Sequence, residues 1–308
     1  MIKNIVFSGG SFNGISYIGC LRALEELNIL ADITTFVGSS SGAIVATLSC
    51  IGYTSDELYQ LIKSIDFDKA KDINEDTILN FGNTYGLDSG NKIKDILELC
   101  IYKKVLKSKI TFLELYTLTA KHLIITGTCL NKQNSATFDY KNTPDMHVCD
   151  ALRISISIPF IFNKCEYNGH TYVDGGLVNN YPITLVENTN NTIGFCIKGL
   201  RDFEKIDSLQ KYATSLIYSV ITKLEDLQTV EYRDKTVYIN CPKILNMFDI
   251  SLQDKIDLYK LGYDKTIDYF NNKAETTKTK PIITLESLHR EIIKLKRTTH
   301  KQKHKFIL

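Results

Sequence analysis

The first 52 residues carry one pattern twice, and this repetition constrains the fold more than any other feature of the chain. Two short apolar runs, KNIVFS and ITTFVG, are typical of buried strands, and each ends in a turn rich in glycine or serine. After the first turn, ISYIGCLRALEELNIL has apolar residues at helical spacing, and after the second, AIVATLSCIGY is typical of a buried helix. Two successive rounds of strand, turn and helix predict parallel strands covered by helices, which indicates the α/β class.

Strand-like and helix-like segments continue to alternate along the rest of the chain. We expect HLIITGTCL and SATFDY to pair across the NKQN turn, and Ser89 to cap the helix that begins at NKIKD. Further strands are expected in HTYVD, TIGFCI and KTVYIN, and further helices over residues 205–228 and 250–272. Residues 274–281 have the composition of a linker, and a helix and a basic tail are expected beyond them. The sequence therefore predicts one domain over residues 1–273 and an extension over residues 274–308.

Composition narrows the class of function. Of the 308 residues, 44% are hydrophobic, which is enough for a large core, and the net charge of +2 disfavours nucleic acid as a partner. The eight cysteines form no C-x-x-C pair and no cluster with zinc spacing, so we expect core thiols in a reducing compartment. No apolar run has the length of a signal peptide or a membrane span. These features predict a cytoplasmic protein.

The stretch TFVGSSSGAIV contains a candidate nucleophile. A tight turn from a strand into a helix needs very small residues two positions before and after its central residue, which is the basis of the G-x-S-x-G pattern. Gly38 and Gly42 stand in these positions around Ser40, whereas Ser39 would have Val37 on its incoming side. Ser41, with a serine and an alanine in these positions, is the weaker alternative, and its backbone N–H can donate to an oxyanion. A purely structural turn is the other interpretation.

The histidines argue against a Ser–His–Asp triad. In α/β-hydrolases the triad follows the order serine, acid, histidine. After Asp174 the chain has His289, His300 and His304, all in the C-terminal extension, which is poor support for a catalytic side chain. Asp174 itself ends a strand-like run and precedes two glycines, so a carboxylate is the better candidate for the base. A surface aspartate in a hairpin turn is the competing interpretation.

The first turn, SGGSFNG, is a candidate oxyanion site. The backbone N–H groups of Gly9, Gly10 and Ser11 can converge on a negative oxygen at the start of the following helix. A dinucleotide site is disfavoured, because the G-x-G-x-x-G fingerprint would need glycine where Ser11 stands. No GK[ST] follows the glycines, which excludes a P-loop.

Three elements in this order resemble the patatin-like phospholipase family, over roughly residues 3–200. FSGGSFNGISYIGCLRALEE is similar to the family's opening strand, oxyanion loop and helix, TFVGSSSGAIVA to its elbow, and YVDGGLVNNYP to the segment with its catalytic aspartate. The resemblance implies a three-layer α/β/α fold with a mostly parallel central sheet. It also implies a lipid acyl hydrolase of the phospholipase A type that works without metal or other cofactor.

The resemblance assigns a role to each matching residue. Ser40 attacks the ester carbonyl and forms an acyl-enzyme, and Asp174 accepts its proton. The N–H groups of four residues would form the oxyanion hole: Gly9, Gly10, Ser11 and Ser41. Six further residues are expected to support the elbow and the loops: Gly38, Gly42, Gly14, Gly175, Gly176 and Asn180.

Two departures from the family pattern keep an alternative open. Ser11 and Asn13 stand where the family's usual G-G-G-x-[KR]-G loop has a glycine and a basic residue. A catalytically weak or inactive member that binds lipid or protein is therefore the second hypothesis. The expected substrate of an active enzyme is a phospholipid or a glyceride. Residues 290–308 carry a net charge of +6, which predicts peripheral contact with anionic membrane, although a docked helix with a solvated tail would have the same composition.

Overall fold

The computed structural model describes residues 1–199, 205–241 and 250–279. Contacts between residues divide the chain into two units, Met1–Ile267 and Asp268–Leu308, and the site described below lies within the first unit. The predicted C-terminal helix and the basic tail at 290–308 lie outside the described residues. In the described part of the chain, no helix is both long and apolar enough to cross a bilayer.

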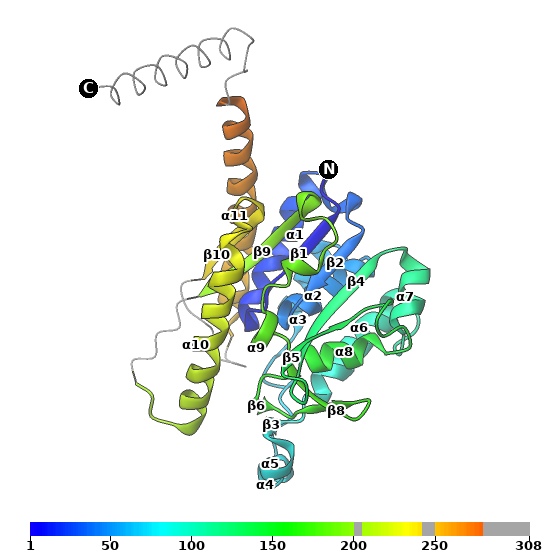
Figure 1. Cartoon of the computed structure of the whole chain (residues 1–308), viewed down its shortest axis with the longest axis vertical. Coiled ribbons are helices and arrows are strands. Elements are labelled where there is room, and N and C mark those ends of the chain that lie inside the picture. Colours follow the sequence, from blue (N-terminus) through cyan, green and yellow to red (C-terminus); the bar gives the residue numbers. More distant parts are fainter. Residues whose placement is uncertain (200–204, 242–249, 280–308) are drawn as a thin grey trace, which may run out of the picture. The chain divides into compact units, whose positions relative to one another are not determined.

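A central, mostly parallel sheet dominates the first unit (Figure 1). Within the described residues it has eight strands. Seven of them follow one path in the order β10 (Thr236–Cys241), β9 (Thr192–Gly199), β1 (Asn4–Phe7), β2 (Thr35–Gly38), β4 (His122–Cys129), β8 (His170–Asp174) and β7 (Cys165–Tyr167). The eighth, β5 (Asn134–Phe138), pairs with β4 beside this path. The strands from β10 to β4 are parallel, and β8, β7 and β5 are antiparallel to their neighbours. Two short strands, β3 (Gly86–Asp88) and β6 (Phe160–Phe162), form a separate parallel pair. The predicted α/β class is confirmed.

Helices fill the connections between the strands, and one more follows the last strand, β10. They are α1 (Ser16–Glu26), α2 (Ser41–Cys50), α3 (Ser55–Ser64), α4 (Glu75–Leu79), α5 (Phe81–Thr84), α6 (Asn91–Val105), α7 (Phe112–Thr119), α8 (Val148–Ser155), α9 (Gly176–Asn179), α10 (Leu209–Val230) and α11 (Leu252–Thr279). Local sequence explains several of their starts. Thr54, for example, forms a capping box with Glu57 at the start of α3, which satisfies backbone N–H groups that the helix leaves without partners.

Both faces of the sheet are buried, as the three-layer arrangement requires. Because successive side chains of a strand point to opposite faces, Val6 and Phe7 of β1 belong to different layers of the core. Val6 packs in a cluster with Tyr181 and Ile183, which follow α9. Phe7 contacts the ring of Tyr17 on α1, with a ring-centroid distance of 5.0 Å. The central strands are therefore held rigidly from both sides.

Most segment predictions agree with the structure, and two need correction. The β4–β5 pairing is confirmed, with Ile125 opposite Phe138. The N-cap position of α6 is Gly90, with φ of 70°, a left-handed conformation that favours glycine, and not Ser89. The Ser89 hydroxyl nevertheless accepts the N–H of Asn91, the first residue of α6, at 3.1 Å. Helix α11 continues to Thr279, through part of the segment expected to be a linker. All eight cysteines are free, and all but Cys165 are buried.

Candidate active site

The strand register brings Asp174 beside Ser40, although 134 residues separate them in the chain. Gly38, the last residue of β2, pairs with Ile125 of β4. Two residues further along β4, Gly127 pairs with Asp174 of β8. Since Ser40 also lies two residues beyond Gly38, the two candidate catalytic residues reach the same edge of the sheet from either side of β4.

Ser40 has the strained backbone of a sharp strand-to-helix turn. Its φ of 51° and ψ of −126° lie outside the regions that residues with a side chain usually adopt. A Cβ atom on Gly38 would lie 2.4 Å from the carbonyl oxygen of Gly42. A Cβ atom on Gly42 would lie 2.5 Å from the carbonyl oxygen of Ser8. The two glycines of the G-x-S-x-G pattern are therefore needed because backbone packs directly against them.

The Ser40 side chain donates a hydrogen bond to the Asp174 carboxylate, with 2.7 Å between Oγ and Oδ2. The other carboxylate oxygen accepts the N–H of Gly176 at 2.7 Å. The carbonyl oxygen of Asp174 accepts the hydroxyl of Thr128 at 2.8 Å, which fixes the end of β8. Both Ser40 and Asp174 are buried. The arrangement provides a hydroxyl and a proton acceptor in hydrogen-bond contact, shielded from solvent.

Ser155 supports the elbow, a role that its sequence context does not signal. The backbone N–H of Ser40 donates to the Ser155 hydroxyl at 2.9 Å. Ser155 is the last residue of α8 and is fully buried. A turn that places Ser40 in a strained conformation leaves this N–H without a partner inside the turn itself, and α8 supplies the acceptor.

The four predicted oxyanion donors lie together, but their N–H groups are used differently. The N–H of Gly9 donates to the carbonyl of Asn180 at 3.0 Å, so it serves to fix the loop. The N–H of Gly10 donates to the hydroxyl of Ser41 at 3.1 Å. The N–H groups of Ser11 and Ser41 have no acceptor among the residues that the structure describes. Ser11 adopts φ of 53°, the conformation that a glycine would favour at this position.

The supporting residues from the sequence patterns surround this centre. A Cβ atom on Gly14 would lie 2.6 Å from the Ser41 hydroxyl oxygen, and one on Gly175 would lie 2.4 Å from Oγ1 of Thr126. A Cβ atom on Gly176 would lie 2.6 Å from Oδ1 of Asn180. These contacts show that the glycines are required by close packing around the dyad.

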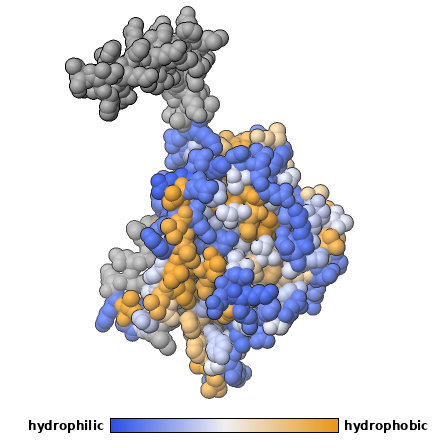
Figure 2. All heavy atoms as spheres, in the orientation of Figure 1, coloured by the Kyte–Doolittle hydropathy of each residue, from blue (hydrophilic) through white to orange (hydrophobic). Residues whose placement is uncertain are grey.

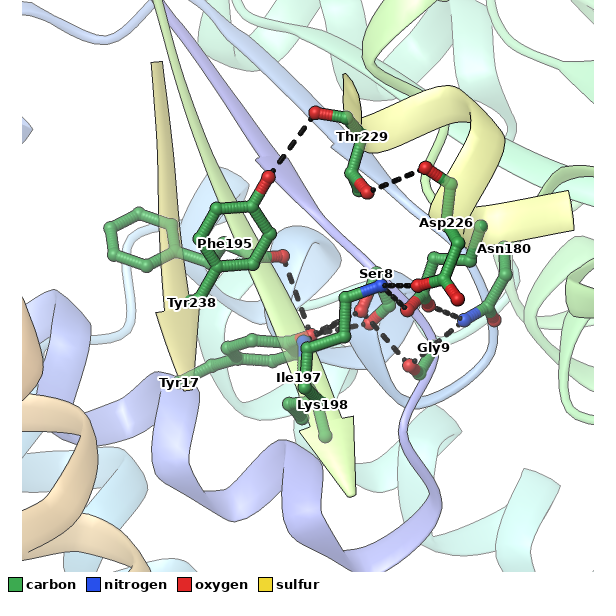
Figure 3. Close-up of polar contacts among 11 residues, drawn as sticks. Ser8, Gly9, Tyr17, Asn180, Phe195, Ile197, Lys198, Asp226, Thr229 and Tyr238 are labelled. Carbon is green, nitrogen blue, oxygen red and sulfur yellow. Dashed lines mark hydrogen bonds and ion pairs between the residues drawn. The ribbon is translucent and has the colours of Figure 1, made fainter. Parts of the chain in front are cut away.

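A polar network, buried at Asn180 and Glu225, joins the oxyanion loop to α10 (Figure 3). The side-chain amide of Asn180 donates to the carbonyl of Gly9 at 3.3 Å and to the carboxylate of Glu225 on α10. Glu225 and Asp226 each accept a bond from the Lys198 ammonium at 2.8 Å. Burial disfavours the charged form of Lys198, yet the pKa of Lys198 is raised overall, because Cys196, Asp226 and Glu225 favour its charge. Sequence patterns identified Asn180 but neither Lys198 nor Glu225.

An apolar pocket of about 200 Å³ adjoins Ser40. Its wall combines residues of α1, α2, α3, α6 and β6 with those of connecting segments. It includes Ile18, Ile44, Leu48, Leu61, Phe67, Ile96, Ile158 and Phe162. The polar groups in the lining, Ser11, Ser40 and Ser41, are all at the catalytic end. Such a pocket fits a hydrocarbon chain attached to a carbonyl group at Ser40.

The described residues contain no cluster of three or more histidine, cysteine, aspartate or glutamate side chains that could hold a metal ion. The donors near Ser40 are backbone N–H groups and hydroxyls, which suit an oxyanion. A hydroxyl, a carboxylate and free N–H groups at the mouth of an apolar pocket can perform acyl transfer from an apolar ester.

Comparison with known proteins agrees with this geometry. Residues 5–186 match the family described as patatin-like phospholipase, and the chain belongs to that family. A probable lipid hydrolase of Invertebrate iridescent virus 6 is 36% identical over 192 residues, which cover 61% of this chain and 64% of that protein. An uncharacterized protein of Acanthamoeba polyphaga mimivirus is 30% identical over 274 residues, covering 85% of this chain and 91% of that protein.

The fold is also similar to that of a solved structure. The crystal structure of VipD from Legionella pneumophila superposes with a TM-score of 0.60 at 17% sequence identity. The superposition covers 88% of this chain and 67% of VipD. The central mostly parallel sheet is thus shared beyond recognisable sequence similarity.

Proposed function

We propose that the protein is a lipid acyl hydrolase of the phospholipase A type, which cleaves carboxylic esters of phospholipids or glycerides through an acyl-enzyme on Ser40. The observation that carries this proposal is the 2.7 Å hydrogen bond between Ser40 and Asp174 beside an apolar pocket. Membership of the patatin-like phospholipase family and the name of the iridescent virus relative support lipid ester hydrolysis.

In the first half of the proposed reaction, the Ser40 oxygen attacks the ester carbonyl while its proton passes to Asp174. The negative oxygen of the tetrahedral intermediate accepts the N–H groups of Ser11 and Ser41, with Gly10 beside them. The intermediate collapses when the leaving alcohol takes the proton from Asp174. The acyl group remains on Ser40 as an ester.

In the second half, water replaces the departed alcohol. Asp174 accepts a proton from the water, whose oxygen attacks the acyl-enzyme carbonyl. The second tetrahedral intermediate expels the Ser40 oxygen, which recovers its proton from Asp174. The fatty acid leaves the apolar pocket, where burial of each methylene group is worth about 0.8 kcal/mol.

The proposal predicts that Ser40→Ala and Asp174→Asn each lower hydrolysis by roughly 10³-fold or more. Purified variants are incubated with phospholipid vesicles or emulsified glycerides, and released fatty acid is measured. Ser49→Ala is the matched control, since Ser49 is a buried serine of α2 whose hydroxyl has no partner among the described residues. A fluorophosphonate probe should label the wild type and the control but not Ser40→Ala.

An inactive member that binds lipid or protein is the second candidate. It is favoured by Ser11 and by Asn13, which is 1% exposed and replaces the basic residue of the family loop. Equal fatty acid release by wild type and both dyad variants, with no probe labelling, would reject the enzyme and leave this alternative.

A further inference from the structure

Helix α10 has an outer face more apolar than a solvent-facing helix should have. Six large apolar side chains form what we call the outer stripe, with exposed fractions from 37% to 64%: Tyr212, Leu216, Val220, Leu224, Leu227 and Val230. Their spacing of three or four residues puts them on one side of the helix. In Figure 2 a hydrophobic band follows the course of α10.

The buried face of the same helix is unusually polar. It includes Thr214, Ile221, Glu225 and Thr229, all less than 9% exposed. At 100° for each residue, these positions lie on the side opposite the outer stripe. A helix that turns its polar side chains inward and its apolar side chains outward normally has a partner for its outer face.

The buried face of α10 also closes the catalytic cleft. Tyr218 and Ile221 line a small cleft of about 20 Å³ together with Ser40 and Asp174. Strand β6 contacts α10 and exposes the ring of Phe160, which enlarges the apolar surface beside this cleft. A partner that binds the outer stripe would therefore contact α10, the helix that borders Ser40 and Asp174.

We propose that the outer stripe of α10 docks on the surface of a lipid aggregate and so holds the catalytic cleft against its substrate. This inference rests on the proposed function, because lipid is then both the docking partner and the substrate. Twenty-two residues give α10 a length of roughly 33 Å, enough to lie along an interface with its apolar side chains in the acyl region.

Lys223 favours a lipid surface over a second copy of the chain. It is exposed and lies within the outer stripe, between Val220 and Leu227 on the helix surface. In a helix–helix interface its ammonium group would be buried, and within the described residues Lys223 forms no ion pair that could compensate for its desolvation. At a lipid surface the same side chain extends to the head groups while its methylene groups stay in the apolar layer.

The test is a double substitution in the stripe, Leu216→Gln with Leu227→Gln, in the full-length protein. The matched control is Leu99→Gln with Leu118→Gln, which changes two equally exposed leucines of α6 and α7. Binding to phosphatidylcholine vesicles is measured by flotation, and turnover is measured separately with a monomeric, water-soluble short-chain ester. We expect vesicle binding of the stripe variant to fall roughly a hundredfold, with the control and the soluble-ester rate unchanged.

Unchanged vesicle binding by the stripe variant would overturn the proposal. So would sedimentation showing that the wild type is a dimer and the stripe variant a monomer, because a second copy would then cover α10. Flotation requires no hydrolysis. If the wild type hydrolyses nothing yet floats with vesicles and the stripe variant does not, the proposed function fails while the docking surface stands.

Discussion

Ser11 has a conformation that glycine adopts at lower cost. Its φ of 53° is left-handed, and a side chain there is disfavoured by about 1 kcal/mol. We therefore predict that Ser11→Gly, which restores the family's usual residue, raises the free energy of unfolding by up to about 1 kcal/mol and keeps hydrolysis at or above the wild-type rate. Urea unfolding and the fatty acid assay measure the two quantities. A less stable and less active variant would mean that the Ser11 side chain itself contributes at this position.

We expect the hydroxyl of Ser155 to contribute more to the free energy of unfolding than the hydroxyl of Ser39, the buried residue before Ser40. Ser155→Ala leaves the backbone N–H of Ser40 buried without an acceptor, at a cost of about 1–3 kcal/mol. Ser39→Ala is the control, because the Ser39 hydroxyl is buried and accepts or donates no hydrogen bond among the described residues. Denaturant unfolding of both variants should separate them, and equal stabilities would show that the elbow does not depend on α8.

The sequence predicted individual site residues where a local pattern specifies them. The spacing of Gly38, Ser40 and Gly42 follows from backbone crowding within five residues. One short stretch of sequence therefore sufficed to select Ser40 as the candidate nucleophile. Ser155 and Glu225 act through hydrogen bonds that span 115 and 45 residues. No short pattern encodes such partners, since their positions depend on how distant elements pack.

At the scale of elements, the turn after β5 supplies a pH-dependent contribution to stability. The Asp139 carboxylate accepts the N–H groups of Lys141 and Asn142 at 2.9 Å and 2.7 Å, and contacts the His122 ring at 3.2 Å. Burial alone would raise the pKa of Asp139, but the His122 ring and the two N–H groups outweigh it, so the pKa of Asp139 is lowered. This stabilisation is fully present above the unfolded-state pKa of about 4 and is lost as the pH falls through the lower folded-state value.

We therefore predict that wild type loses more stability than Asp139→Asn when the pH falls from neutral to about 3. Thermal unfolding across this range measures the difference. Asp95→Asn, which changes an exposed aspartate of α6, is the control and should follow the wild type. Parallel curves for wild type and Asp139→Asn would contradict the role of this turn.

Helices and strands whose apolar residues repeat with a clear helical or alternating spacing could be predicted from the sequence. Short elements that form only because they pair with a distant segment could not. The β4–β5 hairpin and the long helices follow from alternation or helical spacing. Residues 66–90 contain the short elements α4, α5 and β3, which no sequence pattern indicated. Strand β3 has three residues and exists because Gly86 pairs with Phe160, far along the chain. A strand this short has no period for a sequence pattern to reveal.

For the whole molecule, the boundary near residue 273 stays a prediction that truncation can test. A chain ending at Lys273 should fold and keep its rate on a soluble short-chain ester, because the described dyad and pocket lie before that residue. It should bind anionic vesicles more weakly at low salt, since each basic residue near such a surface contributes about 1 kcal/mol. Full-length protein at high salt is the control and should resemble the truncated chain. An unfolded truncation, or one that binds as before, would contradict this division.

The fold class followed from the first 52 residues, but the position of β8 did not. Alternating strands and helices predict parallel pairing, whereas β8 runs antiparallel to β4. In this orientation Asp174 reaches Ser40 because it pairs with Gly127, two residues beyond the partner of Gly38 on β4, and this register depends on contacts between segments that are far apart in the chain.

The catalytic residues and much of the pocket wall come from different stretches of the chain, so they could change independently in evolution. Ser40 and Asp174 are fixed to strands that flank β4, whereas α3 and α6 belong to the stretch between α2 and β4. Insertions or deletions in that stretch would reshape the pocket wall without moving either strand. Acyl-chain preference can therefore diverge among relatives while the geometry of bond cleavage is inherited intact, and exchange of that stretch between relatives offers a route to new substrate ranges.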